Sequence, residues 1–289
     1  MNKKILIVLA CLIATCFYMI ACNGKTAIDW PESPLYDTPE NDPFWNPPGS
    51  LFEAKKAMEG HYAHYDIVAY EEMQDSGPMR TFIISYGFTD LDLEGDALIE
   101  TDQFCSASYK MNQKNIKFHF PDEATQAILP RVKEVEVFQK DGIWMIHRPQ
   151  TPTLLGIYGD PDLPLTTDIN DPNIFDADGD GKDGVTVHIT VGGFLKGELY
   201  LIRREIFQNY LGLYSGGVLF GSVVDDSEQL IIGANKSMFN KPSNPDQHPD
   251  LGLSPMMLIP ISRDIDTCEE LMERRDELFP REPNFLNFR

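Results

Sequence analysis

The chain has 289 residues, of which 42% are hydrophobic and 11% aromatic, enough apolar material for one large domain or two small ones. Its formal net charge is −21, with 45 acidic residues against 24 basic ones. Nucleic acid and anionic membrane surfaces would repel such a chain, so neither is an expected direct partner. Cations would be attracted to it.

The N-terminus has the pattern of a bacterial export signal. A basic MNKK precedes an apolar run over residues 5–21, and the run ends in MIAC at Cys22. This ending resembles the lipobox of bacterial lipoproteins, in which the cysteine is acylated after cleavage. An ordinary secretory signal and a retained transmembrane helix are the alternative readings. We expect a signal peptide over residues 1–21 and a membrane anchor at Cys22, and Asn23 after the cysteine favours the outer membrane over the inner one.

A proline-rich and acidic stretch over residues 22–50 follows the cysteine and has neither helical nor strand periodicity. Prolines keep such a segment extended, so it is expected to be a tether between the anchor and a single β-rich domain over residues 51–289.

Within that domain the dominant hydrophobic period is two, which is typical of strands with one buried face. Runs of this kind cover residues 61–70, 82–89, 97–111, 116–120, 132–140, 143–148, 185–191, 195–207, 217–224, 228–234 and 256–261. Asp141-Gly142 separates two of them and predicts a two-residue hairpin turn.

Helical signal is confined to residues 122–129 and 267–279, the second with Thr267 as N-cap and Glu270 three residues later. The region 149–183 has little strand signal and predicts a long loop. We therefore expect an all-β fold: an antiparallel, up-and-down, lipocalin-like barrel or a two-sheet sandwich of about ten strands with two short helices. The barrel is favoured because it hides strand edges.

The long loop contains FDADGDGKDGV, the one stretch that indicates a specific chemistry. Asp176, Asp178 and Asp180 alternate, and a glycine follows at the sixth position of the loop. Alternate carboxylates in a tight turn converge on one point, as Ca²⁺ requires. The twelfth position holds Val187 where an EF-hand has a bidentate glutamate, so an EF-hand is excluded.

The loop instead resembles the DxDxDGxxD element of FG-GAP blades, dockerins and thrombospondin type 3 repeats. On that likeness the candidate ligands are Asp176, Asp178, Asp180, the carbonyl of Lys182 and Asp183, within a loop region spanning residues 168–184. Asp168 or Asp171 could reach back to the same ion. The alternative is a solvated acidic turn, which repulsion between the carboxylates disfavours unless a cation neutralises them.

Cleavage before Cys22 leaves Cys105 and Cys268 as the remaining thiols. Two cysteines in an exported chain most simply form one disulfide, and two unrelated buried thiols are the alternative.

The sequence contains no recognisable catalytic motif. HExxH and CxxC are absent, and GLYSGG around Ser215 lacks the first glycine of a nucleophile elbow. His61 and His64 lie three apart on an expected strand and so point to opposite faces, which disfavours a zinc site. We therefore expect a protein that is not an enzyme.

Several segments together resemble a group of lipoproteins from delta-proteobacteria, including myxobacteria, and related Gram-negatives. They are Cys105 after a strand, FPDEATQAILP at 120–130, LPLTTDINDPNIFDADGDGKDGVTV at 163–187, GELYLIRR at 197–204, SEQLIIGA at 227–234 and DTCEEL at 266–271. The resemblance covers most of the chain after the tether. The cysteine pair recurs in the group, which supports the bridge. Proline often stands at the position of Asp183, which makes Asp176, Asp178 and Asp180 the firmer ligands.

This group has no established activity. The sequence alone therefore predicts a lipid-anchored envelope protein with a structural Ca²⁺ site that binds a small apolar ligand or a partner protein. An envelope hydrolase with an unrecognised site and a purely structural envelope component are the alternatives.

Overall fold

A computed structural model describes residues 28–29, 45–74, 77–113, 115–241, 243 and 245–285. The expected signal peptide, the lipid anchor at Cys22 and most of the tether lie outside these residues. Within the described part, no helix has the length and apolar character needed to cross a membrane. Contacts divide the chain into a large unit over residues 31–282 and a small one formed by the two ends. In the small unit, β1 (Ile28–Asp29) pairs antiparallel with β14 (Asn284–Phe285).

The large unit is built on a 12-stranded antiparallel sheet, which confirms the expected all-β fold. Its strands are β2 (Gly60–Gln74), β3 (Gly77–Glu94), β4 (Ala97–Met111), β5 (Ile116–His119), β6 (Arg131–Lys140), β7 (Ile143–Leu155), β8 (Val185–Val191), β9 (Leu195–Leu213), β10 (Leu219–Asp225), β11 (Glu228–Ala234), β12 (Asp246–Gln247) and β13 (Pro255–Pro260). The hairpin between β6 and β7 turns at Asp141-Gly142, both with positive φ, as the sequence predicts.

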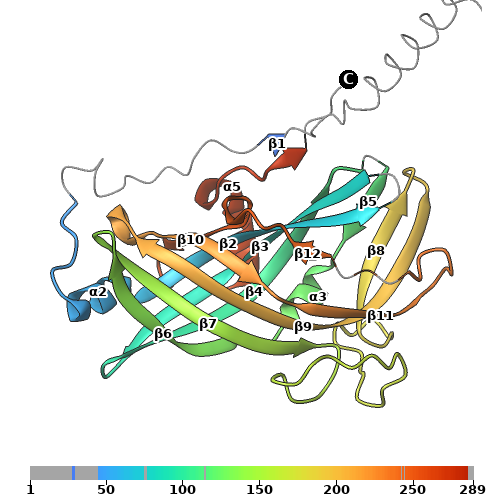
Figure 1. Cartoon of the computed structure of the whole chain (residues 1–289), viewed down its shortest axis with the longest axis horizontal. Helices are drawn as coiled ribbons and strands as arrows, with labels where there is room; N and C mark the ends of the chain where they lie inside the picture. Colours follow the sequence, from blue (N-terminus) through green and yellow to red (C-terminus); the bar gives the residue numbers. More distant parts are fainter. Residues whose placement is uncertain are drawn as a thin grey trace, which may run out of the picture. The chain divides into compact units, whose positions relative to one another are not determined.

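The strand pairings form a ring along part of the sheet. The order β10-β13-β2-β3-β4-β6-β7-β9 returns to its start because β10 also pairs with β9. Strand β9 is long enough to extend beyond the ring, and there its neighbours are β8 on one edge and β11 on the other. Figure 1 shows β5, β8 and β11 at this end of the strands and α2 at the opposite end.

Strand β7 is longer than the alternation predicts, so the expectation of a loop from residue 149 is wrong at its start. The strand continues to Leu155 and pairs with β9 from Met145 onward, with a register shift between Arg148 and Thr151. Its other neighbour, β6, pairs only as far as His147. Pro149 and Pro152 therefore lie where β7 has one free edge, a place where a strand tolerates proline.

Helix α2 (Leu51–Met58) closes one end of the ring, and the sequence reading missed it. Ser50 caps its N-terminus by accepting a hydrogen bond from the Glu53 backbone N–H, and the Glu53 side chain accepts one from the Gly49 N–H at 2.8 Å. Met58 is fully buried in the core cluster at this end. The Ser-x-x-Glu spacing was the available signal, because it is the sequence form of a capping box.

The core at the α2 end consists of large aliphatic and aromatic side chains from every strand of the ring. Its buried members are Met58, Tyr62, Val68, Tyr70, Leu91, Leu98, Val135, Ile146, Phe207, Leu211, Leu213, Leu219, Val223, Met256 and Leu258. Trp144 also packs there and donates to the Pro48 carbonyl at 2.7 Å, which ties the segment before α2 to the barrel.

A layer of buried charge crosses the ring beyond this core. Arg131 on β6 makes two hydrogen bonds to Asp102 on β4, at 2.9 and 2.7 Å. Arg148 on β7 lies 3.0 Å from Glu100 and 3.3 Å from Asp102. Asn209 on β9 donates to Glu100 at 3.1 Å, and because β4 and β9 are not neighbours in the ring, this hydrogen bond spans its interior. All five side chains are buried.

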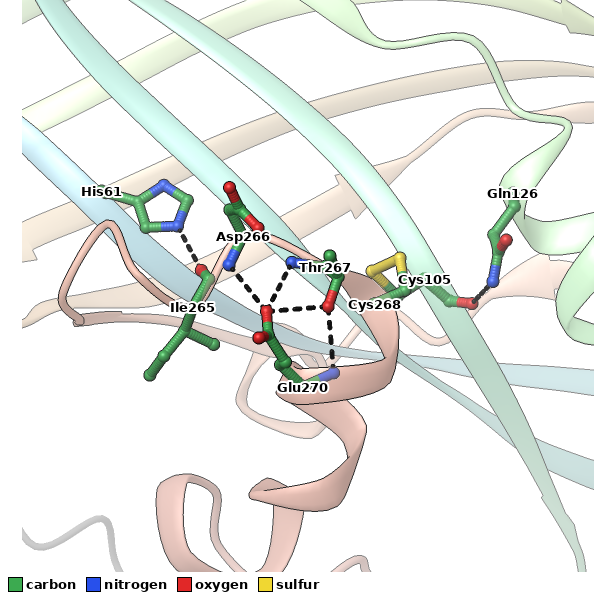
Figure 2. The surroundings of a disulfide bond; sticks show 8 residues. All are labelled: His61, Cys105, Gln126, Ile265, Asp266, Thr267, Cys268 and Glu270. Carbon is green, nitrogen blue, oxygen red and sulfur yellow. Dashed lines mark hydrogen bonds between the residues drawn. A yellow bond between two sulfur atoms is a disulfide. The ribbon is translucent and has the colours of Figure 1, made fainter.

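The C-terminal segment packs on the outside of β2, β3 and β4. Its helices are α4 (Cys268–Glu273) and α5 (Arg275–Leu278), which Arg274 separates, so the expected single helix is interrupted. Thr267 and Glu270 form the predicted capping box (Figure 2). Cys268 bonds to Cys105 on β4, so these two cysteines form the expected disulfide rather than separate buried thiols.

Candidate functional site

A cavity of about 390 Å³ lies at the end of the barrel away from α2. Its apolar lining comes from β3, β4, β5, β8, β9, β11 and the segment before β12. These residues are Met79, Ile83, Tyr109, Met111, Ile116, Phe118, Val187, Ile189, Val191, Leu199, Leu201, Ile231, Met238, Phe239 and Pro245. Polar lining residues are fewer and include Glu72, Arg203, Asp225, Ser227, Gln229, Lys241 and Ser243.

Strand alternation explains why this cavity is apolar. On β8, Val187, Ile189 and Val191 share one face and line the cavity, while His188 between them is exposed. On β9, Leu199 and Leu201 do the same from the neighbouring strand. Period-two side chains point to alternate faces, so two adjacent strands supply a continuous hydrocarbon wall.

Charged and phenolic groups form the floor of the cavity. The next inward position on β9 is Arg203, whose Nε lies 2.7 Å from Glu205 Oε1. The Tyr70 hydroxyl donates to Asp225, which also accepts hydrogen bonds from Ser227. A second cavity of about 50 Å³ adjoins this floor and shares Arg203, Tyr70 and Tyr109 with the larger one.

Burial shifts the ionisation of these floor groups. Desolvation raises the pKa of the Glu205 carboxyl, and the Asp225 charge adds to this, while Arg203 opposes it. Desolvation also raises the pKa of the Tyr109 phenol to about 12, so this hydroxyl is a neutral hydrogen-bond donor at physiological pH.

The acidic loop brings three of the predicted ligands together. One carboxylate oxygen from each of Asp176, Asp178 and Asp180 lies within 4.8 Å of the other two. Asp176 accepts from the backbone N–H groups of Gly179 and Gly181, both at 2.8 Å. These bonds fold the loop around the Asp176 carboxylate, and the positive φ of both glycines allows the turn.

The loop is fastened to the first residues of β8. Asp178 Oδ2 accepts from the Thr186 N–H at 2.8 Å, and the Thr186 hydroxyl donates to Asp180 Oδ2 at 2.7 Å. A side chain at Gly184 would lie 2.4 Å from the Leu201 carbonyl oxygen, so only glycine allows the loop to pass so close to β9. Any ion held by these aspartates would therefore fix the strand that walls the cavity.

The three aspartates are not electrostatically equivalent. Hydrogen bonds from backbone N–H groups, that of Gly181 foremost, lower the pKa of Asp176. Desolvation raises the pKa of Asp178, and its neighbours Asp180 and Asp176 add to the effect. Oδ1 of Asp178 is buried without a hydrogen-bond partner among the described residues. This oxygen and the shared negative charge make the cluster suited to a cation.

The other predicted aspartate ligands lie outside this group of three carboxylates. Asp183 is exposed, and neither it nor Asp168 nor Asp171 belongs to the group. Asp168 and Asp171 accept hydrogen bonds in their own local turns, from the backbone N–H of Asn170 and Asn173. The Lys182 ammonium lies 5.9 Å from the centre of the Tyr200 ring.

A hydroxyl, an imidazole and a carboxylate also lie in line inside the barrel. His64 Nδ1 is 2.8 Å from the Thr89 hydroxyl, and His64 Nε2 is 2.8 Å from Asp66 Oδ2. The order matches a hydrolase triad. However, the three residues are 0–3% exposed, and none of them lines either of the two cavities, so neither cavity brings a substrate to this group.

Comparison with protein-family models, curated proteins and solved structures finds no match to this chain. The assignment of a function therefore rests on the chain's own geometry.

The sequence reading missed the residues that give the cavity its polar floor. One signal could have found Arg203 and Glu205: they continue the alternation phase of Leu199 and Leu201, whose side chains are apolar and inward-facing. Charged residues in the buried phase of a strand are candidates for an internal site. Tyr70 and Tyr109 carried no comparable signal, because tyrosine is common on both faces of a strand.

Proposed function

We propose that this protein binds a small apolar ligand inside its barrel. The observation that carries the proposal is the cavity of about 390 Å³ with a predominantly hydrocarbon wall. Its volume falls in the range of small-molecule sites, which are mostly apolar with a few placed polar groups. Removing such a wall from water is favourable by roughly 25 cal/mol per Å² of apolar surface, which supplies the driving force for binding.

The shape of the interior supports a binding cup rather than a channel. Helix α2 and the core beneath it close one end of the ring, and this core reaches the cavity floor, where Tyr70 belongs to both. A ligand would therefore enter and leave through the same mouth. A barrel whose interior is filled by side chains would instead have favoured the binding of a partner protein as the function.

We further propose that the protein works in the bacterial cell envelope, lipid-anchored at Cys22, with the outer membrane as its site. The MIAC motif and Asn23 support this placement. The disulfide between Cys105 and Cys268 agrees with it, because such bonds persist in oxidising compartments and are rare in the cytosol. In this setting the protein would act as a carrier or receptor rather than as an enzyme.

We also propose that Asp176, Asp178 and Asp180 bind Ca²⁺ with a structural role. Three carboxylates within 4.8 Å of one another offer the hard oxygen ligands that Ca²⁺ prefers. Ca²⁺ tolerates an irregular shell, with water or backbone carbonyls completing it, whereas Mg²⁺ demands a near-octahedral one. The hydrogen bonds from Thr186 to Asp178 and Asp180 link this ion to β8.

Filling the cavity should abolish ligand binding. Ile231 on β11 lines the cavity, and Leu230 next to it does not, although both are partly buried. We expect Ile231→Trp to weaken binding of a neutral apolar fluorescent probe at least tenfold, because the indole would occupy the space of the ligand. Leu230→Trp, the matched control, should bind the probe within about threefold of the wild type. Equal binding by all three proteins would place the probe outside the cavity.

Calcium should stabilise the barrel through the acidic loop. Calcium at a free concentration of about 100 times its Kd adds roughly 2.7 kcal/mol to the free energy of unfolding. This corresponds to a rise of about 5 °C or more in melting temperature. Asp176→Asn with Asp178→Asn should remove this rise, because the amides lack the negative charge that holds the ion. The amide at position 176 also loses one of the two oxygens that accept from the Gly179 and Gly181 N–H groups, so each protein is compared with itself in the presence and absence of calcium. Asp160→Asn with Asp162→Asn, in the same long loop but outside the cluster, should retain it. A wild type whose melting is insensitive to calcium would show that the loop is only a turn.

A further inference from the structure

The guanidinium of Arg203 is only partly used by the protein. Its Nε faces Glu205, and this nitrogen is buried without good hydrogen-bond geometry. Among the described residues, neither terminal nitrogen makes a hydrogen bond. Neither is fully buried, in contrast to the Nε atom. Because the residue lines both cavities, these two nitrogens are open to the cavity space. They are hydrogen-bond donors without an acceptor.

The hydroxyl of Tyr109 adds a second donor at the same floor. Tyr109 lines both cavities, and within the described part of the chain its hydroxyl contacts no hydrogen-bond partner. The Tyr109 ring packs against Phe118 and Phe120, which hold it at the junction of the two cavities. Arg203 and Tyr109 thus present donors to whatever occupies the apolar space above them.

The charge of the floor decides what kind of acceptor fits. Arg203 interacts with two carboxylates, Glu205 and Asp225. The other nearby guanidinium, Arg131, also interacts with Glu205 but is held by two hydrogen bonds to Asp102, so the floor has no positive charge left over when both carboxylates are ionised.

A ligand carboxylate would add a further negative charge in a desolvated site. A protonated amine would be attracted by the carboxylates, but Glu205 already faces Arg203 and Asp225 already accepts from Tyr70 and Ser227. Its N–H groups would therefore face the donors of Arg203 and Tyr109. A neutral carbonyl accepts from both and adds no charge, so it avoids both costs.

We propose that the ligand carries an uncharged hydrogen-bond acceptor, an ester or ketone carbonyl on a hydrocarbon body, which Arg203 and Tyr109 bind at the cavity floor. This inference rests on the proposed ligand-binding function and adds the chemical class of the ligand. It also assigns Glu205 a role in selectivity, because its charge balances Arg203 and repels acidic ligands.

A matched series of compounds that share an eight-carbon chain tests the proposal by displacement of a neutral fluorescent probe at pH 7.5. The compounds are methyl octanoate, octanoate, octylamine and octane. The ester should bind the wild type at least tenfold more tightly than octanoate or octylamine, and severalfold more tightly than octane. Octanoate binding as tightly as the ester would overturn the assignment while leaving the cavity as a binding site. If no member of the series displaces the probe, the proposed function and this inference both fail.

Variants of the floor give a second, independent readout. Glu205→Gln removes one negative charge and should improve octanoate binding at least tenfold while changing ester binding less than threefold. Arg203→Met combined with Glu205→Gln removes both charges of the pair, so neither partner is left as an unpaired charge. In this variant the affinity for the ester should fall to the affinity for octane. An unchanged preference for the ester in this double variant would show that Arg203 is not its partner.

Discussion

Arg148→Met should lower the free energy of unfolding by about 3–5 kcal/mol, because breaking a buried ion pair from one side leaves the partner charge uncompensated. Arg148 is 1% exposed and lies between Glu100, at 3.0 Å, and Asp102, at 3.3 Å. Burial already raises the pKa of Glu100 despite this partner. Burial alone would raise the pKa of the Asp102 carboxyl, but the charges of Arg131 and Arg148 outweigh burial and lower that pKa to about 2. Urea unfolding at pH 7 measures the loss.

Two controls separate the charge effect from simple loss of packing. Arg148→Met with Glu100→Gln removes both charges of one pair and should recover more than half of the stability. Arg274→Met disrupts an exposed pair with Glu277 and should cost less than about 1 kcal/mol. If the single and double variants at the buried layer were equally unstable, the loss would come from the missing side-chain volume and not from the unpaired carboxylate.

Loss of the disulfide should have an effect of similar size. Cys105 and Cys268 are 163 residues apart in sequence, so their bond closes a very long loop in the unfolded chain. The chain-entropy model gives about 5 kcal/mol for such a loop, and removal of a native disulfide typically costs about 2–5 kcal/mol. We expect Cys105→Ala with Cys268→Ala to unfold at a correspondingly lower urea concentration.

The reduced wild type is the matched control for this variant. With dithiothreitol present, the free energies of unfolding of the wild type and the double alanine variant should agree within about 1 kcal/mol. Without reductant, they should differ by the full contribution of the disulfide, about 2–5 kcal/mol. The account of the bridge would be contradicted if reductant left the stability of the wild type unchanged.

Most of the strands could be predicted because they have a period of two and the turns between them have specific residues. Asp141-Gly142 is an example: both residues adopt positive φ, which is the requirement of the tight hairpin. A closed barrel was the favoured fold, but the strand pairs that close the ring could not be predicted. They depend on β9 being long enough to pair with β7 and β10 at one end and with β8 and β11 at the other. No local pattern gives the partners of a strand.

The buried charge was invisible in the sequence for a similar reason. On β4, Leu98, Glu100 and Asp102 alternate and are all buried, yet a strand reading assigns acidic residues to solvent. Their partners Arg131 and Arg148 come from other strands, so the pairing exists only in the closed ring. The acidic loop was predictable because its ligands are local in sequence, whereas the cavity floor draws on β2, β4, β9 and β10.

The location of a bound ligand tests the central proposal most directly. A crystal structure of the protein soaked with methyl 8-bromooctanoate should show one anomalous bromine peak inside the barrel, near the mouth of the cavity. The ester carbonyl should lie within hydrogen-bond distance of Arg203 at the floor. Bromine found only on the outer surface of the barrel, with the interior filled by water or side chains, would contradict the proposal that this protein holds an apolar ligand in its cavity.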